Sequence, residues 1–228
     1  RFYLTEVQFH PNSSRANYEA GTVYGQLIEM GEGDIETNYK QTFYYFTRSI
    51  ELDSNSVSGL FGNYLAAIDT GHRVEQAWID EIKFRLSNRK INAVSISWLR
   101  QMINCIKAEK CSTESLQLKD IISSALENKS LSNKRKALLY DIYADYSYTI
   151  DSDVMQAVSM AKNAIDYNPS EIKHYIRLIS YLVVSDKYEE ARKLIATVKQ
   201  KDKSGRFSKE IDELSKAITI RDQDTNRR

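Results

Sequence analysis

Small side chains recur at a fixed spacing in the C-terminal half of this 228-residue chain. Ala157 and Ala191 stand 34 residues apart, and at the same offset Ala164 aligns with Val198. Two helices approach closely only where small side chains meet, so this spacing predicts helix pairs that repeat along the chain. The 8 Gly and 2 Pro are fewer than sandwiches, barrels and Rossmann folds need for their turns. The sequence therefore predicts an all-α fold.

The pattern resembles the tetratricopeptide repeat, a helix hairpin with a period of about 34 residues. The stretches "DVMQAVSMAKNAIDYNP" and "DKYEEARKLIATVKQKD" carry the likeness, and Pro169 stands where the family's second helix ends. The resemblance implies a right-handed α–α superhelix of antiparallel hairpins. We expect repeat-like units at about 15–54, 136–169 and 172–205. The first of these is degenerate, because residues 31–40 form an insertion that we interpret as a loop.

Residues 55–135 lack the motif but keep apolar residues at helical spacing, for example Ile96, Leu99 and Ile103. We interpret them as irregular helix pairs in the same stack. A helix at 207–221 has one apolar stripe and a polar back, which is typical of the cap on an open-ended array. Residues 222–228 are predicted to be a flexible tail. Residues 1–221 are thus expected to form a single helical domain.

The only two cysteines, Cys105 and Cys111, flank a short charged stretch. A zinc site needs about four nitrogen or sulfur ligands, and the three His are far apart in the sequence. A thioredoxin-type pair has two intervening residues, fewer than separate these two. Two interpretations stay open: reduced, buried thiols, or a disulfide. We favour the disulfide, because a turn between a helix ending near Lys107 and the next helix can bring the sulfurs together.

A disulfide would indicate an oxidising compartment. The chain also resembles the soluble C-terminal tetratricopeptide region of polytopic bacterial membrane proteins, some related to membrane glycosyltransferases. The stretch "HPNSSRANYEAGTVY" and the cysteine-containing hairpin before "AIDYNP" carry this likeness. It implies an extracytoplasmic, periplasmic domain that reaches the membrane only through a region upstream of Arg1. Glycosylation sequons at Asn12 and Asn128 agree with secretion. The alternative is a cytosolic scaffold or adaptor with reduced cysteines.

Catalysis finds little support in the sequence. It contains no nucleophile-elbow, zinc-protease or phosphate-loop motif, so we expect no catalytic residue, no cofactor and no metal. A small enzyme on a helical scaffold is the less favoured alternative. We interpret His10 as a helix-end residue, His72 as a turn residue and His174 as a surface or groove residue. The 32 basic and 31 acidic residues nearly balance, so nucleic acid is not an expected partner.

A protein or peptide partner is the predicted ligand. In the repeat family, the first helix of each unit lines a concave groove that receives extended peptides or partner helices. The resemblance places ten residues on this groove: Arg15, Tyr18, Thr22 and Gln26 in the first unit, Asp141, Asp145 and Tyr148 in the second, and Lys173, Ile176 and Ser180 in the third. The aromatic run at 41–46 is expected to pack between helices instead.

Overall fold

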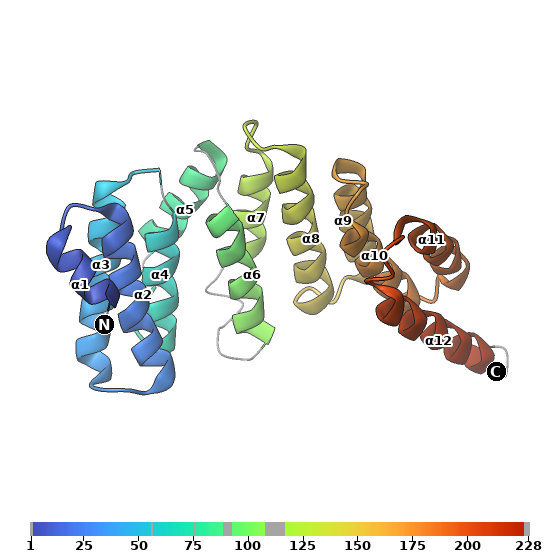
Figure 1. Ribbon diagram of the computed structural model, residues 1–228, viewed down its shortest axis with the longest axis horizontal. Coiled ribbons are helices and arrows are strands. Elements are labelled where there is room, and N and C mark those ends of the chain that lie inside the picture. The colour runs from blue at the N-terminus through green and yellow to red at the C-terminus, as the bar shows by residue number, and fades with distance from the viewer. Residues whose placement is uncertain (1, 56, 75, 89–92, 108–116, 226–228) are drawn as a thin grey trace. The chain divides into compact units, whose positions relative to one another are not determined.

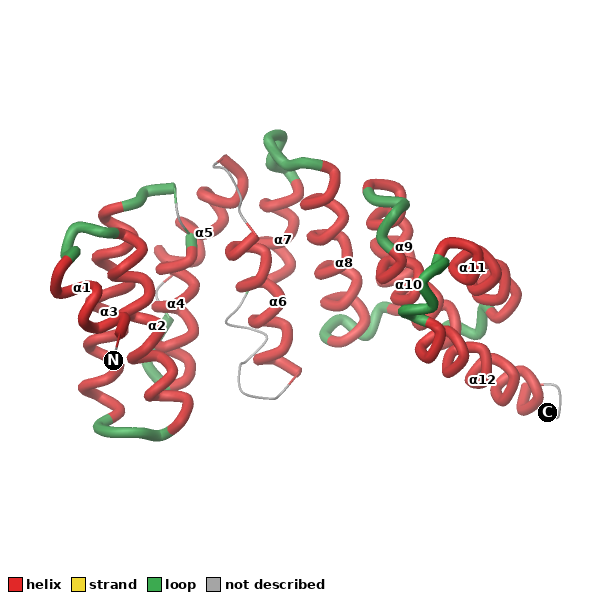
Figure 2. Tube along the Cα trace, viewed as in Figure 1, coloured by secondary structure: helices red, strands yellow, loops and turns green. Residues whose placement is uncertain are grey.

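The computed structural model describes residues 2–55, 57–74, 76–88, 93–107 and 117–225 (Figure 1). Every regular element within these ranges is an α-helix, joined by loops and turns, as Figure 2 shows. The predicted all-α fold is therefore confirmed. The chain divides into two compact units, Arg1–Leu131 and Ser132–Arg228. We call them unit 1 and unit 2. The range predicted as a single domain, residues 1–221, extends over both units.

Unit 1 begins with α1 (Phe2–Phe9), followed by a hairpin of α2 (Ser14–Met30) and α3 (Ile35–Leu52). The side chain of Ser13 caps α2 by accepting a hydrogen bond from the Ala16 amide, and Asp34 caps α3 in the same way through Thr37. Gly31 ends α2 in a left-handed conformation with a φ of 66°, which glycine adopts without steric cost. Local capping thus fixes where this hairpin turns.

The insertion that we expected as a loop at residues 31–40 is mostly helix. Only residues 31–34 connect the two helices, and the remainder forms the start of α3. The extra residues lengthen the hairpin, because α2 and α3 contain 17 and 18 residues. The helices of the predicted unit at 172–205, α10 (Ile172–Val184) and α11 (Tyr188–Lys201), contain 13 and 14. The prediction was wrong because the Asp34 cap allows a helix to start soon after Gly31.

Phe46 is the centre of close packing in unit 1. This side chain is 3% exposed and lies against Gly21 of α2 and Gly62 of α4 (Ser58–Asp69). A Cβ atom added to Gly21 would lie 2.7 Å from the Phe46 ring, and one on Gly62 would overlap the opposite edge of the ring. The two glycines therefore allow three helices to approach one aromatic ring, and the expected packing role of this residue is confirmed.

The rest of unit 1 consists of α5 (Gln76–Asn88), α6 (Ala93–Lys107) and α7 (Leu118–Leu126). Their predicted apolar stripes are buried, with Ile82, Leu99 and Ile121 each 0% exposed. The pairing is not simply sequential, since α6 packs against α4 and α5 packs against α7. Asn128 is 2% exposed, and its side-chain amide donates to the Leu86 carbonyl at 2.7 Å. This bond joins the end of α7 to α5 and contradicts a glycosylated Asn128.

Unit 2 comprises α8 (Asn133–Thr149), α9 (Val154–Tyr167), α10 (Ile172–Val184), α11 (Tyr188–Lys201) and α12 (Ser208–Thr225). Ala157 and Ala191 are both 0% exposed and belong to one apolar core, so the predicted helix contact is confirmed. The capping helix continues past 221, and the Asp222 side chain pairs with Arg192 of α11. The predicted tail at 222–228 is thus helical up to Thr225, and residues 226–228 lie outside the described ranges.

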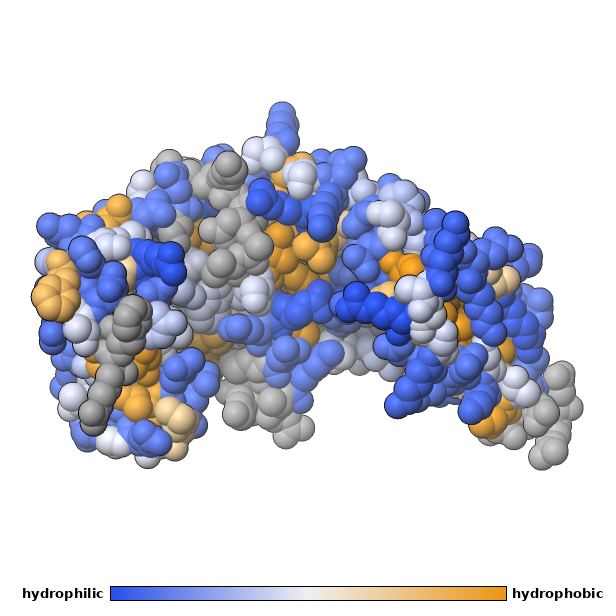
Figure 3. All heavy atoms as spheres, in the orientation of Figure 1, coloured by the Kyte–Doolittle hydropathy of each residue, from blue (hydrophilic) through white to orange (hydrophobic). Residues whose placement is uncertain are grey.

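Hydrophilic residues cover most of the face of each unit that Figure 3 presents, and apolar side chains show between them. None of the described helices combines the length and the apolar character that crossing a bilayer requires.

Candidate functional site

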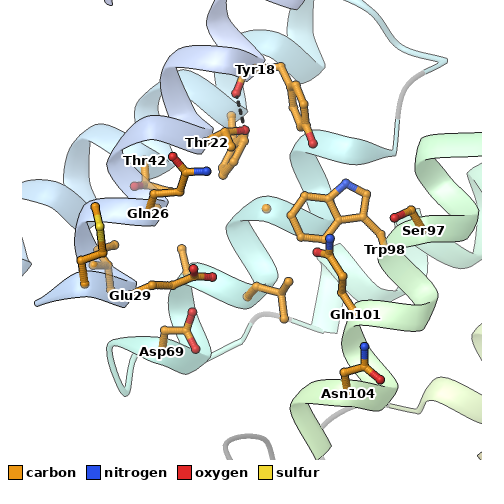
Figure 4. Close-up of a pocket in the computed structure, with 17 residues that line it drawn as sticks. Tyr18, Thr22, Gln26, Glu29, Thr42, Asp69, Ser97, Trp98, Gln101 and Asn104 are labelled. Atoms are coloured by element: carbon orange, nitrogen blue, oxygen red, sulfur yellow. Dashed lines mark hydrogen bonds between the residues drawn. The ribbon is translucent and has the colours of Figure 1, made fainter. Parts of the chain in front are cut away.

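A pocket of about 1,000 Å³ lies in unit 1 between α2, α3, α4 and α6 (Figure 4). Three of the four groove residues predicted for the first unit line it, namely Tyr18, Thr22 and Gln26. Arg15 lies outside the pocket, where its Nε atom pairs with Glu19 at 2.8 Å. The structure therefore brings three predicted residues together in one concave space. That they contact a partner stays a prediction.

Helical spacing explains why these side chains share a space. Tyr18, Thr22, Gln26 and Glu29 follow one another at intervals of four, four and three residues along one face of α2. The facing side of α6 contributes Trp98, Gln101 and Asn104 by the same rule. On α4 the pocket is lined by Gly62, which has no side chain, and by the small or medium side chains of Ala66 and Leu65. Because α4 presents little bulk here, the space between α2 and α6 stays open.

One end of the pocket is aromatic. In Figure 4 the hydroxyl of Tyr18 points toward the indole nitrogen of Trp98. The Trp98 ring stacks on Phe61 of α4, with centroids 6.2 Å apart and planes at 9°, and Tyr18 packs against Phe46 at 5.6 Å. Burial raises the pKa of the Tyr18 hydroxyl above its usual value, and hydrogen bonding with Trp98 acts in the opposite direction. Both rings are thus held in place by the core while one face remains accessible to the pocket.

The other end carries carboxylates. Glu29 of α2 and Asp69 of α4 both line the pocket, and Figure 4 shows both side chains at this end. Among the described residues, the lining contains no Lys, Arg or His. Thr42 of α3 forms part of the wall near Gln26, and its hydroxyl is fully buried without a hydrogen-bond partner in the described structure. A buried hydroxyl normally has such a partner.

The groove positions predicted on α8 are used differently. Asp141 is 4% exposed, and its carboxylate accepts from the Nδ1 atom of His174 at 2.9 Å. Arg177 bridges Asp141 at 3.1 Å and Asp145 at 3.5 Å, and the Tyr181 hydroxyl donates to Asp145 at 2.7 Å. Burial and the neighbouring Asp145 carboxylate raise the pKa of Tyr181. We call these five residues the α8–α10 network.

This network corrects two expectations. His174 was expected at the surface or in the groove, and it is 1% exposed between two helices. Asp141 was expected to face a groove, but its carboxylate contacts His174 and Arg177 of α10. The physical reason is the four-residue spacing of Asp141 and Asp145, which places both opposite the polar side chains of α10. The interpretation of His10 and His72 fits the structure, since they follow the ends of α1 and α4.

The remaining groove positions of unit 2 do not form one pocket. Tyr148 is 38% exposed, with its ring 5.3 Å from that of Tyr181. Ser180 donates its hydroxyl to the backbone carbonyl of Ile176 at 3.0 Å, and both residues are half-buried. Lys173 is exposed and lines a separate hollow of about 470 Å³ beside Lys201.

Several pocket residues escaped the sequence analysis. Glu29 extends the spacing of Tyr18, Thr22 and Gln26 by one further turn, so that signal was present. Trp98, Gln101 and Asp69 belong to helices without the repeat motif, and no sequence pattern connected them to α2.

The cysteine prediction lies outside the described residues. Helix α6 ends at Lys107, as expected, but the side chain of Cys105 and the whole of Cys111 are not described. The disulfide therefore stays a prediction. Across the part of the chain that the structure describes, no group of three or more His, Cys, Asp or Glu side chains could hold a metal ion.

Comparisons with known proteins give limited similarity. No protein-family model matches the chain, and no curated protein matches it either. Among solved structures, MamA 41-end from Desulfovibrio magneticus RS-1 is similar at 14% identity with a TM-score of 0.43, over 83% of this chain and 97% of that one. The MamA RS-1 ArsTM double mutant gives 13% identity, the same TM-score and the same coverage. The fold assignment accordingly rests on the helices of this chain themselves.

Proposed function

We propose that this chain is a non-catalytic protein-interaction domain, and that a segment of a partner protein binds in the unit 1 pocket. The observation that carries the proposal is the pairing of two fixed aromatic rings, Tyr18 and Trp98, with flexible amide side chains in one space of about 1,000 Å³. Rigid rings offer contact area at little entropic cost. The pocket thus combines the two kinds of contact that peptide recognition uses.

The amides of Gln26, Gln101 and Asn104 suit an extended peptide. Each side chain can donate and accept, so together they can satisfy backbone N–H and C=O groups that lose water on binding. Because α2, α4 and α6 are tied to the core of unit 1 through Phe46 and Phe61, the lining is largely preformed. A preformed site spends less binding free energy on ordering itself.

The two tryptophans of the chain provide a matched test. Trp98 lines the pocket, whereas Trp78 of α5 packs on Phe43 outside it, with centroids 5.6 Å apart, and both side chains are half-buried. Wild-type protein, Trp98→Ala and Trp78→Ala should be used as baits in extracts of cells that express the full-length protein. We expect a partner that the wild type and Trp78→Ala retain and Trp98→Ala loses. Circular dichroism confirms folding of each bait.

Retention of every partner by Trp98→Ala would count against the pocket as the binding site. Loss of the same partners by both tryptophan variants would attribute the effect to unit 1 as a whole rather than to the pocket, and would also count against it.

We further propose that the chain is the extracytoplasmic soluble part of a larger membrane protein. Support comes from the positions of the cysteines, since Cys105 stands in the last turn of α6 and Cys111 precedes α7. Purification without reductant followed by thiol titration in denaturant should find no free thiol. Two titratable thiols per chain would favour the cytosolic scaffold instead, and would leave the pocket proposal standing.

A further inference from the structure

We propose that the segment bound in the unit 1 pocket carries a Lys or Arg side chain, whose cationic head lies at the carboxylates of Glu29 and Asp69. This inference rests on the proposed function and specifies the chemistry of the partner. It is carried by two observations on the same pocket: the charge of its lining, and the apolar surface that lies beside the acidic groups.

The charge of the lining is one-sided. Glu29 and Asp69 are both exposed, they come from different helices, and both lie at one end of the pocket (Figure 4). Like charges that share one space repel, and a cation that binds there is attracted by both. Asp69 also has an interaction within the chain, so Glu29 is the principal acceptor and Asp69 the second. No described basic side chain lines the pocket to take this place.

The lining suits a long side chain with a charged tip. Met30, which is 60% exposed, and the half-buried Leu65 supply apolar surface within the pocket, and the carboxylates lie at the end away from the Tyr18 and Trp98 rings. Lys and Arg bury an aliphatic stem along such a surface and place only the head on polar groups. The Tyr18 and Trp98 rings then receive the neighbouring part of the segment, which connects this inference to the proposed function.

The test uses immobilised hexapeptide pools in which one central position is fixed as Arg, Lys, Glu or Leu and the others are randomised. The intact chain is bound to each pool as wild type and as Glu29→Gln. A matched control is Glu127→Gln, which removes an exposed carboxylate in unit 1 outside the pocket with the same change in net charge. We expect the Arg and Lys pools to bind the wild type best. Glu29→Gln should weaken their binding about tenfold, as for loss of a charged hydrogen bond.

Three further outcomes decide the inference. Glu29→Lys should reverse the preference toward the Glu pool, which a mere loss of folding would not produce. A second outcome is binding that Trp98→Ala abolishes but that shows no preference for the Arg or Lys pools. This result would overturn the inference of a bound cation and leave the proposed function intact. Equal weakening by Glu29→Gln and Glu127→Gln would assign the effect to net charge, and this result also overturns the inference.

Discussion

The two units differ in what surrounds the helix face that was predicted to line a groove. On α2 of unit 1, side chains at four-residue spacing line an open pocket, whereas on α8 of unit 2 Asp141 and Asp145 are consumed by contacts with α10. The facing helix decides the difference. Helix α4 presents Gly62 and Ala66 to the pocket, while α10 presents the long polar side chains of His174, Arg177 and Tyr181. A groove position is thus open to solvent, and to a ligand, only where the neighbouring helix leaves room.

Removing Asp141 should have the largest effect on unit 2. Asp141→Ala leaves His174 and Arg177 without their shared carboxylate, and His174 is 1% exposed, so we expect a loss of about 3 kcal/mol in the free energy of unfolding. Urea denaturation followed by circular dichroism measures it. The matched control is Asp166→Ala, an exposed position on α9, for which we expect a change within about 0.5 kcal/mol. Equal effects of the two substitutions would remove the contrast between the units.

Adding a methyl group to Gly62 should cause the next largest loss of stability, and this loss occurs in unit 1. The new Cβ would overlap the Phe46 ring, so we expect Gly62→Ala to destabilise the fold by about 2 kcal/mol. Gly25 of α2 also lines the pocket, but an added Cβ there meets nothing within 4 Å. Gly25→Ala should therefore stabilise the helix by about 0.5 kcal/mol. Thermal unfolding compares the two, and a destabilised Gly25→Ala would mean that the pocket wall is closer packed than described.

Acid titration should give the smallest effect. Hydrogen bonding to the Thr37 side chain and amide holds the pKa of Asp34 below its usual value of 3.8. Because this pKa is depressed in the folded state, the stability that Asp34 contributes is present above the pKa of the unfolded chain and is lost as pH falls through the folded pKa. Asp34→Asn should therefore flatten the decrease in stability between about pH 4 and pH 2. An unchanged slope in urea titrations across this range would show that the α3 cap does not contribute.

The helical packing could be predicted because it depends on side-chain size at fixed offsets. Ala157 and Ala191 both have small side chains, and their 34-residue separation indicated that each packs against a neighbouring helix. The first-unit pocket residues followed from the same regularity along α2. Asp34 is a residue type that caps helices, yet we expected a loop at 31–40. The structure shows that most of this insertion forms the start of α3.

Contacts between distant positions could not be predicted. Asp141 meets His174 across 33 residues, and Lys83 meets Gln117 across 34, neither of which a local pattern reveals. The part of α12 beyond residue 221 includes the pair between Arg192 and Asp222, which are 30 residues apart. The division near residue 131 lies close to the expected start of the repeat-like unit at 136, but no Gly or Pro in the stretch "ENKSLSNKRK" indicated that two compact units meet there. Trp98 and Gln101 became pocket residues through such long-range packing.

Site-specific photo-cross-linking tests the central contrast most directly. A photoreactive phenylalanine analogue is placed either at Gln101, in the unit 1 pocket, or at Tyr148, a groove position of unit 2 that is 38% exposed. Each protein is irradiated with the same bound partner, and the cross-linked yield is measured. We predict cross-linking from Gln101 and little from Tyr148. Cross-linking from Tyr148 alone would contradict the account, because the partner would then bind the unit in which Asp141 and Asp145 are occupied by contacts with α10.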